Sequence, residues 1–283
     1  MTDIKRLFLF AVYDPTGIID DAVIYYVSEI AKYGDVIVCT DYDFSKPEID
    51  KLKPYTIHII NNRHSEYDFG SYKRAYQYAH DKDILKNYNV LYLLNDSVFG
   101  PFIDIEPTLN KNEQLKTDAA GMVVSEHKTH VFMESWFIRL NKKIFLAPWF
   151  NEFISNVKHE ERKALVTIKY EHGLTNVIKD NDCSWGGVYT YHGRTTYNKP
   201  KLLFKNGCPF VKRASFTRHN GAIGNQIKYI LDNANPVARE SVMQTANRIY
   251  GEKYMKWLLT YNPLKIFWRN ITYGIEKIKN GKI

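Results

Sequence analysis

The sequence predicts an α/β domain over residues 1–250, with a mostly parallel sheet flanked by helices, and an amphipathic helical tail over residues 251–283. One observation and one rule of chain topology support the fold class. Before residue 100, short apolar runs of strand length alternate with segments whose apolar residues recur every three or four positions. Strands that are separated by helices pair in parallel through right-handed crossovers.

Four strands and three helices are expected in this first part. The strands are runs rich in Val, Ile, Leu and Phe, and the helices carry apolar residues at helical spacing, with Gly34 ending the first helix. The expected strands are 7–13, 35–40, 56–60 and 90–94, and the expected helices are 18–33, 45–52 and 68–80.

The second part of the chain alternates less regularly. Residues 119–124 predict a strand, and 135–140 predict a short strand or the start of a helix. Residues 144–154 and 164–179 carry helical spacing, whereas 182–197 is rich in Gly and Tyr and predicts loops or a hairpin.

The composition is that of a soluble globular protein. The chain has 283 residues, of which 45% are hydrophobic and 25% charged. No apolar run approaches the roughly 20 residues of a membrane-spanning helix. The three cysteines form no C-x-x-C pair, which excludes a zinc knuckle and a disulfide framework and indicates the reducing cytoplasm. The apolar stretch after Lys5 and Arg6 is too short for a signal peptide and is interpreted as the first strand.

The net charge is +8, from 39 Lys and Arg residues against 31 Asp and Glu residues. This excess favours anionic partners such as nucleic acids, acidic lipid headgroups or phosphorylated substrates. Apart from Lys212, Arg213 and the tail, the basic residues are dispersed, and no nucleic-acid-binding module is present. We therefore expect no nucleic-acid partner.

Polar residues follow the expected strands, where ligands bind in parallel sheets. Asp41 and Asp43 form a D-x-D triplet after the second strand, which suits a divalent ion, a nucleoside or a solvated turn. The position favours nucleoside contact. Asp96, in Asn95-Asp96-Ser97 after the fourth strand, is expected either to bind a metal–diphosphate or to cap the next turn.

Asp68 stands at the start of the expected helix 68–80 and is interpreted as its N-cap. With Arg63, Lys73 and Arg74 nearby, this helix N-terminus also suits a phosphate group.

Other catalytic and metal motifs find little support. His127 and His130 lie three positions apart but lack a third ligand, so no metal site is expected there. The sequence contains no G-x-S-x-G, Walker A or G-x-G-x-x-G motif, which argues against hydrolase, P-loop and dinucleotide-binding functions.

Six segments, in order along the chain, resemble the rhamnan synthesis protein F family of glycosyltransferases. They are YDPTGIIDDAVIYYVSEI at 13–30, DFGSYKRAY at 68–76, LLNDSVFGP at 93–101, MESWFI at 133–138, YEHGLT at 170–175 and GCPFVKR at 207–213. The resemblance covers most of residues 7–215. It implies a GT-A-type, Rossmann-related fold, a nucleotide-sugar donor, with dTDP-L-rhamnose as the namesake, and a role in assembling a cell-surface polysaccharide.

The resemblance also implies roles for individual residues. Asp96 stands where related enzymes carry D-x-D, so it would bind the donor diphosphate or a Mg²⁺ or Mn²⁺ ion. Glu171 matches the catalytic base of family 2 glycosyltransferases, although the second acid of that element is His172 here. Glu171 would take the acceptor proton in a single, inverting displacement. The remaining expected donor-binding residues are Tyr13, Asp41, Arg63, Asp68, Lys73, Asn95, Ser97 and Lys212. The alternative is a non-catalytic subunit that binds a nucleotide sugar or a glycan.

The tail carries seven Lys or Arg residues against two Asp or Glu residues, and its apolar residues recur at steps of three and four. Asn262 and Pro263 are expected to divide it into two helices, with Asn262 as N-cap. A basic helix with an aromatic face suits an anionic membrane surface. We therefore expect a peripheral protein on the inner face of the plasma membrane, acting on a glycan or lipid-linked acceptor. The alternative is that the stripe packs onto the catalytic domain or onto a second subunit in a homodimer.

Overall fold

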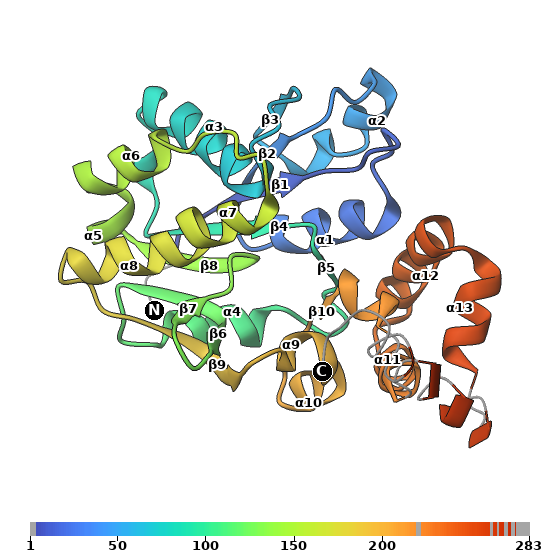
Figure 1. Ribbon diagram of the computed structural model, residues 1–283. Helices are drawn as coiled ribbons and strands as arrows, with labels where there is room; N and C mark the ends of the chain where they lie inside the picture. The colour runs from blue at the N-terminus through green and yellow to red at the C-terminus, as the bar shows by residue number, and fades with distance from the viewer. Residues whose placement is uncertain are drawn as a thin grey trace. The chain divides into compact units, whose positions relative to one another are not determined.

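The computed structural model describes residues 4–218 and 222–260 and, in the tail, 263, 264, 266–268, 271, 272 and 275. The chain forms two compact units (Figure 1). The first unit comprises Met1–Asp96 and Ile105–Gly193, and the second comprises Ser97–Asp104 and Arg194–Ile283. The expected boundary between residues 250 and 251 therefore falls inside the second unit.

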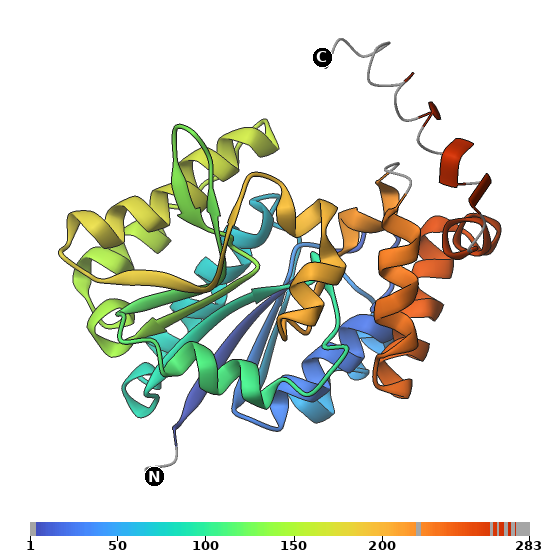
Figure 2. The same cartoon turned by 90° about the horizontal axis from the view of Figure 1, so that it is seen from below.

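The first unit is built on one sheet. Its strands are Arg6–Val12 (β1), Asp35–Thr40 (β2), His58–Asn61 (β3), Val90–Asn95 (β4), Ala119–Glu126 (β6), Val131–Met133 (β7), Phe137–Asn141 (β8) and Trp185–His192 (β9). Their order is β3-β2-β1-β4-β8-β6-β7, and β9 pairs with β6 (Figure 2). The β3-β2-β1-β4 half is parallel throughout, and β8 lies antiparallel between β4 and β6.

Helices cover both faces of this sheet. They are Asp21–Ala31 (α1), Lys46–Asp50 (α2), Tyr67–Asp81 (α3), Glu106–Glu113 (α4), Lys142–Phe145 (α5), Pro148–Ser155 (α6), Lys163–Val166 (α7) and Gly173–Asp180 (α8), with 3₁₀ turns at Lys53–Tyr55 and Leu85–Asn87. Alternate β1 side chains face opposite ways: Leu9 shares a buried cluster with Tyr72 of α3, whereas Phe10 packs edge-on against Tyr26 of α1 with ring centroids 4.9 Å apart. The predicted α/β class, with a mostly parallel, helix-flanked sheet, is confirmed.

Three predictions for the second part of the chain differ from the structure. The expected helix 144–154 is divided into the short helices α5 and α6. The expected helix 164–179 is interrupted by a π-helix, Thr167–His172, between α7 and α8. The prediction of loops or a hairpin over 182–197 is wrong, because β9 lies there, parallel to β6. A Cβ on Gly187 would lie 2.7 Å from Val124 Cγ2, so the glycine that suggested a loop is needed for close strand approach.

The second unit is mainly helical. Its elements are the antiparallel strands Val98–Phe99 (β5) and Val211–Lys212 (β10), a 3₁₀ turn at Arg213–Thr217, and the helices Thr195–Asn198 (α9), Pro200–Lys205 (α10), Ile223–Asp232 (α11), Pro236–Tyr250 (α12) and Glu252–Leu259 (α13). Across the described part of the chain, we find no helix with the length and apolar character needed to cross a membrane.

The beginning of the predicted tail belongs to the packed core of this second unit. Met255 and Leu258 of α13 are each 1% exposed, and Tyr254 Oη donates a hydrogen bond of 2.7 Å to Phe216 O. Truncating either apolar side chain to Ala would cost about 2–5 kcal/mol. For residues 252–259, the apolar stripe of the tail therefore packs onto the rest of the chain, as the alternative expectation has it. The expected N-cap Asn262 lies outside the described residues.

Candidate functional site

The carboxyl ends of β2, β1 and β4 lie side by side because these strands are paired in parallel. Asn95 is the last residue of β4, and Asp96 follows it at the edge of the sheet. The half-buried Asp96 accepts a hydrogen bond of 3.2 Å on Oδ2 from Tyr13 N, directly after β1. The structure thus brings Tyr13, Asn95 and Asp96 together, as the parallel-sheet argument requires.

A chain of hydrogen bonds joins three predicted site residues, and we call its members Asp68, Asn95, Tyr72, Ser135 and Glu171 the site network. Asn95 Nδ2 donates to Asp68 Oδ2 at 2.9 Å and to Tyr72 Oη at 3.1 Å. Tyr72 Oη donates to Ser135 O at 3.0 Å. Ser135 N donates to Glu171 Oε1 at 2.7 Å. Two of the expected donor-side residues, Asp68 and Asn95, are therefore connected to the expected acceptor-side residue Glu171.

Glu171 lies in the π-helix Thr167–His172. π-Helices are rare, and they occur frequently at functional sites. The neighbouring His172 packs its ring 4.2 Å from that of Phe132 and 4.5 Å from that of His130. Burial, together with the nearby histidines, lowers the pKa of His172, so this ring is uncharged at neutral pH. His172 is therefore not a substitute for the second acid of the resembled element.

Both carboxylates of the D-x-D triplet hold the loop between β3 and α3. Asp41 Oδ1 accepts hydrogen bonds from His64 N at 2.8 Å and from Ser65 N at 2.6 Å. Asp43 Oδ1 accepts one of 2.9 Å from the backbone of the exposed Arg63. Asp41 is only 8% exposed. These bonds give the triplet a structural role at the edge of the sheet, and its contact with a nucleoside stays a prediction.

The remaining predicted cations have protein partners. Lys73 Nζ lies 3.3 Å from Glu66 Oε2 and donates to Val157 O at 2.7 Å. Ser97 and Lys212 belong to the second unit, where Lys212 Nζ donates to Ser97 Oγ at 3.2 Å.

Sequence reasoning missed Tyr72 and Ser135. Tyr72 lies one helical turn after Asp68, and that spacing is a signal that could have placed it in the site. Ser135 takes part through its backbone, which a side-chain pattern does not reveal. The N-cap interpretation of Asp68 is wrong, because the N-cap of α3 is Glu66 and Asp68 lies in the first turn.

We expect Tyr72→Phe to loosen the site network. Tyr72 is fully buried, and burial raises the pKa of its hydroxyl, which therefore stays protonated and donates to Ser135 O. The substitution leaves the buried Asn95 Nδ2 and the half-buried Ser135 O without this partner, at a cost of about 1–3 kcal/mol in the free energy of unfolding. Tyr76→Phe is a matched control, because Tyr76 Oη donates to Phe145 O outside the network. A lower turnover number with Tyr72→Phe but not Tyr76→Phe indicates positioning, whereas equal turnover contradicts it.

We expect His64 to make the stability of the folded protein depend on pH. Its side chain is 0% exposed, its Nδ1 accepts from Glu66 N at 3.1 Å, and its Nε2 lies 2.9 Å from Ser71 Oγ. Burial lowers the pKa of His64 from 6.5 to about 4. Between these two values the unfolded chain binds a proton that the folded chain does not, so stability falls as the pH decreases.

We expect His64→Asn to reduce the slope of the free energy of unfolding against pH. The reduction corresponds to at most one proton taken up on unfolding. Urea unfolding at several pH values between 6.5 and about 4 measures the slope. The exposed His80 of α3 serves as a control. An unchanged slope in His64→Asn would mean that other groups account for the pH dependence.

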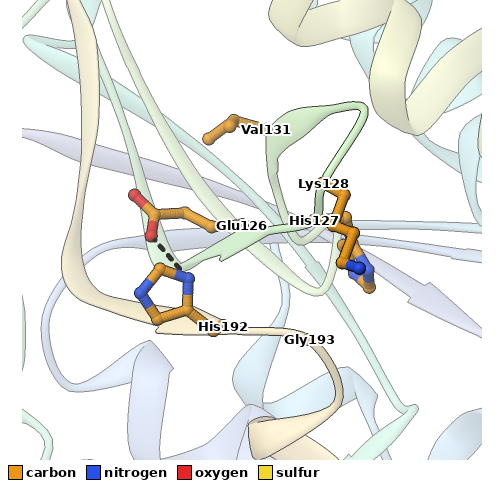
Figure 3. Close-up of a pocket in the computed structure, with 6 residues that line it drawn as sticks. All are labelled: Glu126, His127, Lys128, Val131, His192 and Gly193. Carbon is orange, nitrogen blue, oxygen red and sulfur yellow. Dashed lines mark ion pairs between the residues drawn. The ribbon is translucent and has the colours of Figure 1, made fainter.

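A separate hollow of about 540 Å³ lies at the ends of β6 and β9 (Figure 3). Its lining residues are Glu126, His127, Lys128, Val131, His192 and Gly193. Glu126 Oε2 and His192 Nδ1 form an ion pair of 3.0 Å. This lining includes none of the predicted site residues, so the hollow is not the site proposed from the sequence.

Asp96 is the carboxylate directly after β4 that is expected to hold a divalent ion. Among the residues that the structure describes, no group of three or more His, Cys, Asp or Glu side chains is arranged to hold a metal ion. Mg²⁺ is commonly held by one or two carboxylates together with substrate phosphates and water. Asp96 therefore fits an ion that is bound jointly with a diphosphate.

Comparison with known proteins places the chain in a family. Residues 36–273 match the family described as rhamnan synthesis protein F. The uncharacterized protein y4gN of Sinorhizobium fredii is 23% identical over 150 residues. That alignment covers 50% of this chain and 38% of the relative, so the chain spans well under half the length of that curated protein.

Three solved structures are similar at low identity. A Desulfovibrio desulfuricans G20 protein, provisionally described as a nucleotide-diphospho-sugar transferase, has 15% identity and a TM-score of 0.43, covering 89% of this chain and 98% of its own. The S. cerevisiae mannosyltransferase Ktr4p, in complex with GDP, has 9% identity and a TM-score of 0.33, covering 53% and 60%. Core-mannan synthase A of Aspergillus fumigatus, in a Mn/GDP form, has 8% identity and a TM-score of 0.34, covering 57% and 67%.

The family match extends over most of the chain and includes Asp68, Asp96 and Glu171. The protein therefore belongs to the rhamnan synthesis protein F family.

Proposed function

We propose that this protein is a glycosyltransferase that moves a sugar, with rhamnose as the first candidate, from a nucleotide-diphosphate donor to a growing, lipid-linked cell-surface polysaccharide. The site network is the observation that supports this proposal. It joins Asn95, next to Asp96 at the strand ends, to the half-buried carboxylate Glu171. A donor group at the strand ends and a base on the acceptor side are the two parts that sugar transfer requires.

The proposed reaction is a single displacement with inversion at the anomeric carbon. Glu171 takes the proton of the acceptor hydroxyl, and the hydroxyl oxygen forms a bond to the anomeric carbon of the donor sugar. The bond from that carbon to the diphosphate oxygen breaks, and the nucleoside diphosphate leaves with the electron pair. Asn95 and Tyr72 hold Ser135, whose N–H orients Glu171 Oε1.

Charge develops on the leaving diphosphate. Asp96 would hold a Mg²⁺ or Mn²⁺ ion jointly with the diphosphate, and such an ion, when bound, neutralises part of that charge. Tyr13 N, which donates to Asp96 Oδ2, fixes the orientation of this carboxylate. We place the reaction at the cytoplasmic leaflet of the plasma membrane, where a lipid-linked acceptor would be accessible.

A thermal-shift screen of nucleoside diphosphates and their sugars tests the donor. Binding to the folded state raises the apparent unfolding temperature by mass action. We expect dTDP and dTDP-L-rhamnose, with a divalent ion, to give the largest shifts. Slow hydrolysis of the same donor by the purified chain would support an enzyme. Binding with neither hydrolysis nor transfer would support a non-catalytic subunit. No binding of any nucleoside diphosphate would contradict both the enzyme and a nucleotide-sugar-binding subunit, and would leave a glycan-binding subunit as the alternative.

A further inference from the structure

The two compact units carry net charges of opposite sign. The second unit contains 17 Lys and Arg residues against 5 Asp and Glu residues, whereas the first contains 22 against 26. The second unit therefore carries +12 and the first −4, so the whole positive excess of the chain resides in the second unit. A concentrated field of this sign attracts anionic surfaces.

The tail of this second unit presents large apolar side chains to solvent. Leu264 is 71% exposed, Phe267 58%, Trp268 62% and Ile275 47%. Leu264, Trp268 and Ile275 follow one another in the sequence at steps of four and seven, a spacing that is typical of one helical face. Phe267 adjoins Trp268, with ring centroids 6.4 Å apart.

The preceding helix α13 behaves differently. Its apolar residues Met255 and Leu258 are buried, while Lys253 and Lys256 are exposed. The exposed apolar face therefore starts after α13, and basic side chains flank it on the N-terminal side.

We infer that the second unit is the part of the protein that docks on an anionic phospholipid bilayer, with Phe267 and Trp268 entering the headgroup region. The concentrated positive charge supplies long-range attraction to the anionic lipids. The exposed aromatic side chains become buried when they enter the lipid headgroup region. A second copy of the chain is a poor occupant of this face, because two units of +12 repel each other. A nucleic acid would match the charge but offers little apolar surface to Leu264 and Ile275. The inference is independent of sugar transfer.

Flotation of the full chain with vesicles, without any nucleotide sugar, tests this inference. We expect binding to phosphatidylcholine vesicles that contain phosphatidylglycerol, weaker binding to phosphatidylcholine alone, and loss of binding at high salt. Phe267→Ser combined with Trp268→Ser should weaken partitioning about tenfold, because the apolar contribution is removed. Urea unfolding confirms that this variant is folded.

Charge reversal locates the docking surface. Lys253→Glu combined with Lys256→Glu should weaken partitioning at least about tenfold, since each basic residue near an anionic surface contributes measurably to binding. Lys82→Glu combined with Lys116→Glu makes the same change in net charge on exposed lysines of the first unit, and it should have little effect. Equal weakening by both pairs would overturn the assignment to the second unit.

Two further results would overturn the inference. One is that the Phe267 and Trp268 double variant floats with the anionic vesicles to the same extent as the unmodified chain. The other is tighter binding to a single-stranded oligonucleotide than to the anionic vesicles, which would indicate a nucleic-acid surface. Because no donor is present, these results leave the proposed sugar transfer untouched.

Discussion

Asp96→Asn is expected to lower the turnover number at least roughly 100-fold, because a preorganised charge next to a reacting group is usually worth several kcal/mol in the transition state. The change removes one negative charge and little else. Asn keeps an oxygen that can accept the hydrogen bond from Tyr13 N, so the strand-end geometry should persist. Transfer or donor hydrolysis with a donor identified by thermal shift measures the loss.

A surface aspartate provides the control for this experiment. Asp83 is exposed and pairs with Lys86 after α3, so Asp83→Asn removes the same charge away from the strand ends. We expect it to retain normal turnover. Near-normal turnover in a folded Asp96→Asn protein would remove Asp96 from the donor or metal role.

Glu171→Gln is expected to reduce the turnover number by roughly 10²–10⁴-fold with little change in donor affinity, because removal of a general base acts on the transition state. Gln retains an oxygen that can accept from Ser135 N, so the connection within the site network is preserved. Donor affinity from the thermal-shift titration and the turnover number are measured on the same preparation.

The structure argues against the alternative that Glu171 is merely an exposed residue on the surface of a helix. Its Oε1 accepts a hydrogen bond from a backbone group 36 positions away, and the side chain is half-buried. Glu161→Gln, at an exposed position before α7, is the matched control. If donor affinity collapses in Glu171→Gln while turnover holds, Glu171 is a binding residue rather than the base.

Local patterns predicted the first half of the fold well. The expected strands 7–13, 35–40 and 90–94 differ by no more than one residue at either end from β1, β2 and β4. These strands are buried on both faces, so an unbroken apolar run is a sufficient signal. The expected helix 18–33 begins later, at Asp21, because Asp20 acts as N-cap and accepts from Val23 N at 2.8 Å.

Patterns failed where contacts between distant segments decided the structure. The glycines of β9 suggested a loop, but Gly187 faces Gly121 of β6 across a parallel pairing. The expected helix 164–179 is interrupted by a π-helix, in which the backbone hydrogen bonds span five residues instead of four. The apolar pattern continues through this segment, so the periodicity of the sequence does not reveal the change.

The sequence by itself determined the α/β class, the polar strand ends with Tyr13, Asn95 and Asp96, and the basic, aromatic character of the tail. These properties depend on residues close together in the chain, so local spacing reveals them. Only the tertiary structure decided that Tyr72 and Ser135 connect Asn95 to Glu171, and that the positive charge is gathered in one compact unit. Both depend on which distant segments pack together, and buried hydrogen bonds and core contacts across long sequence separations determine that packing.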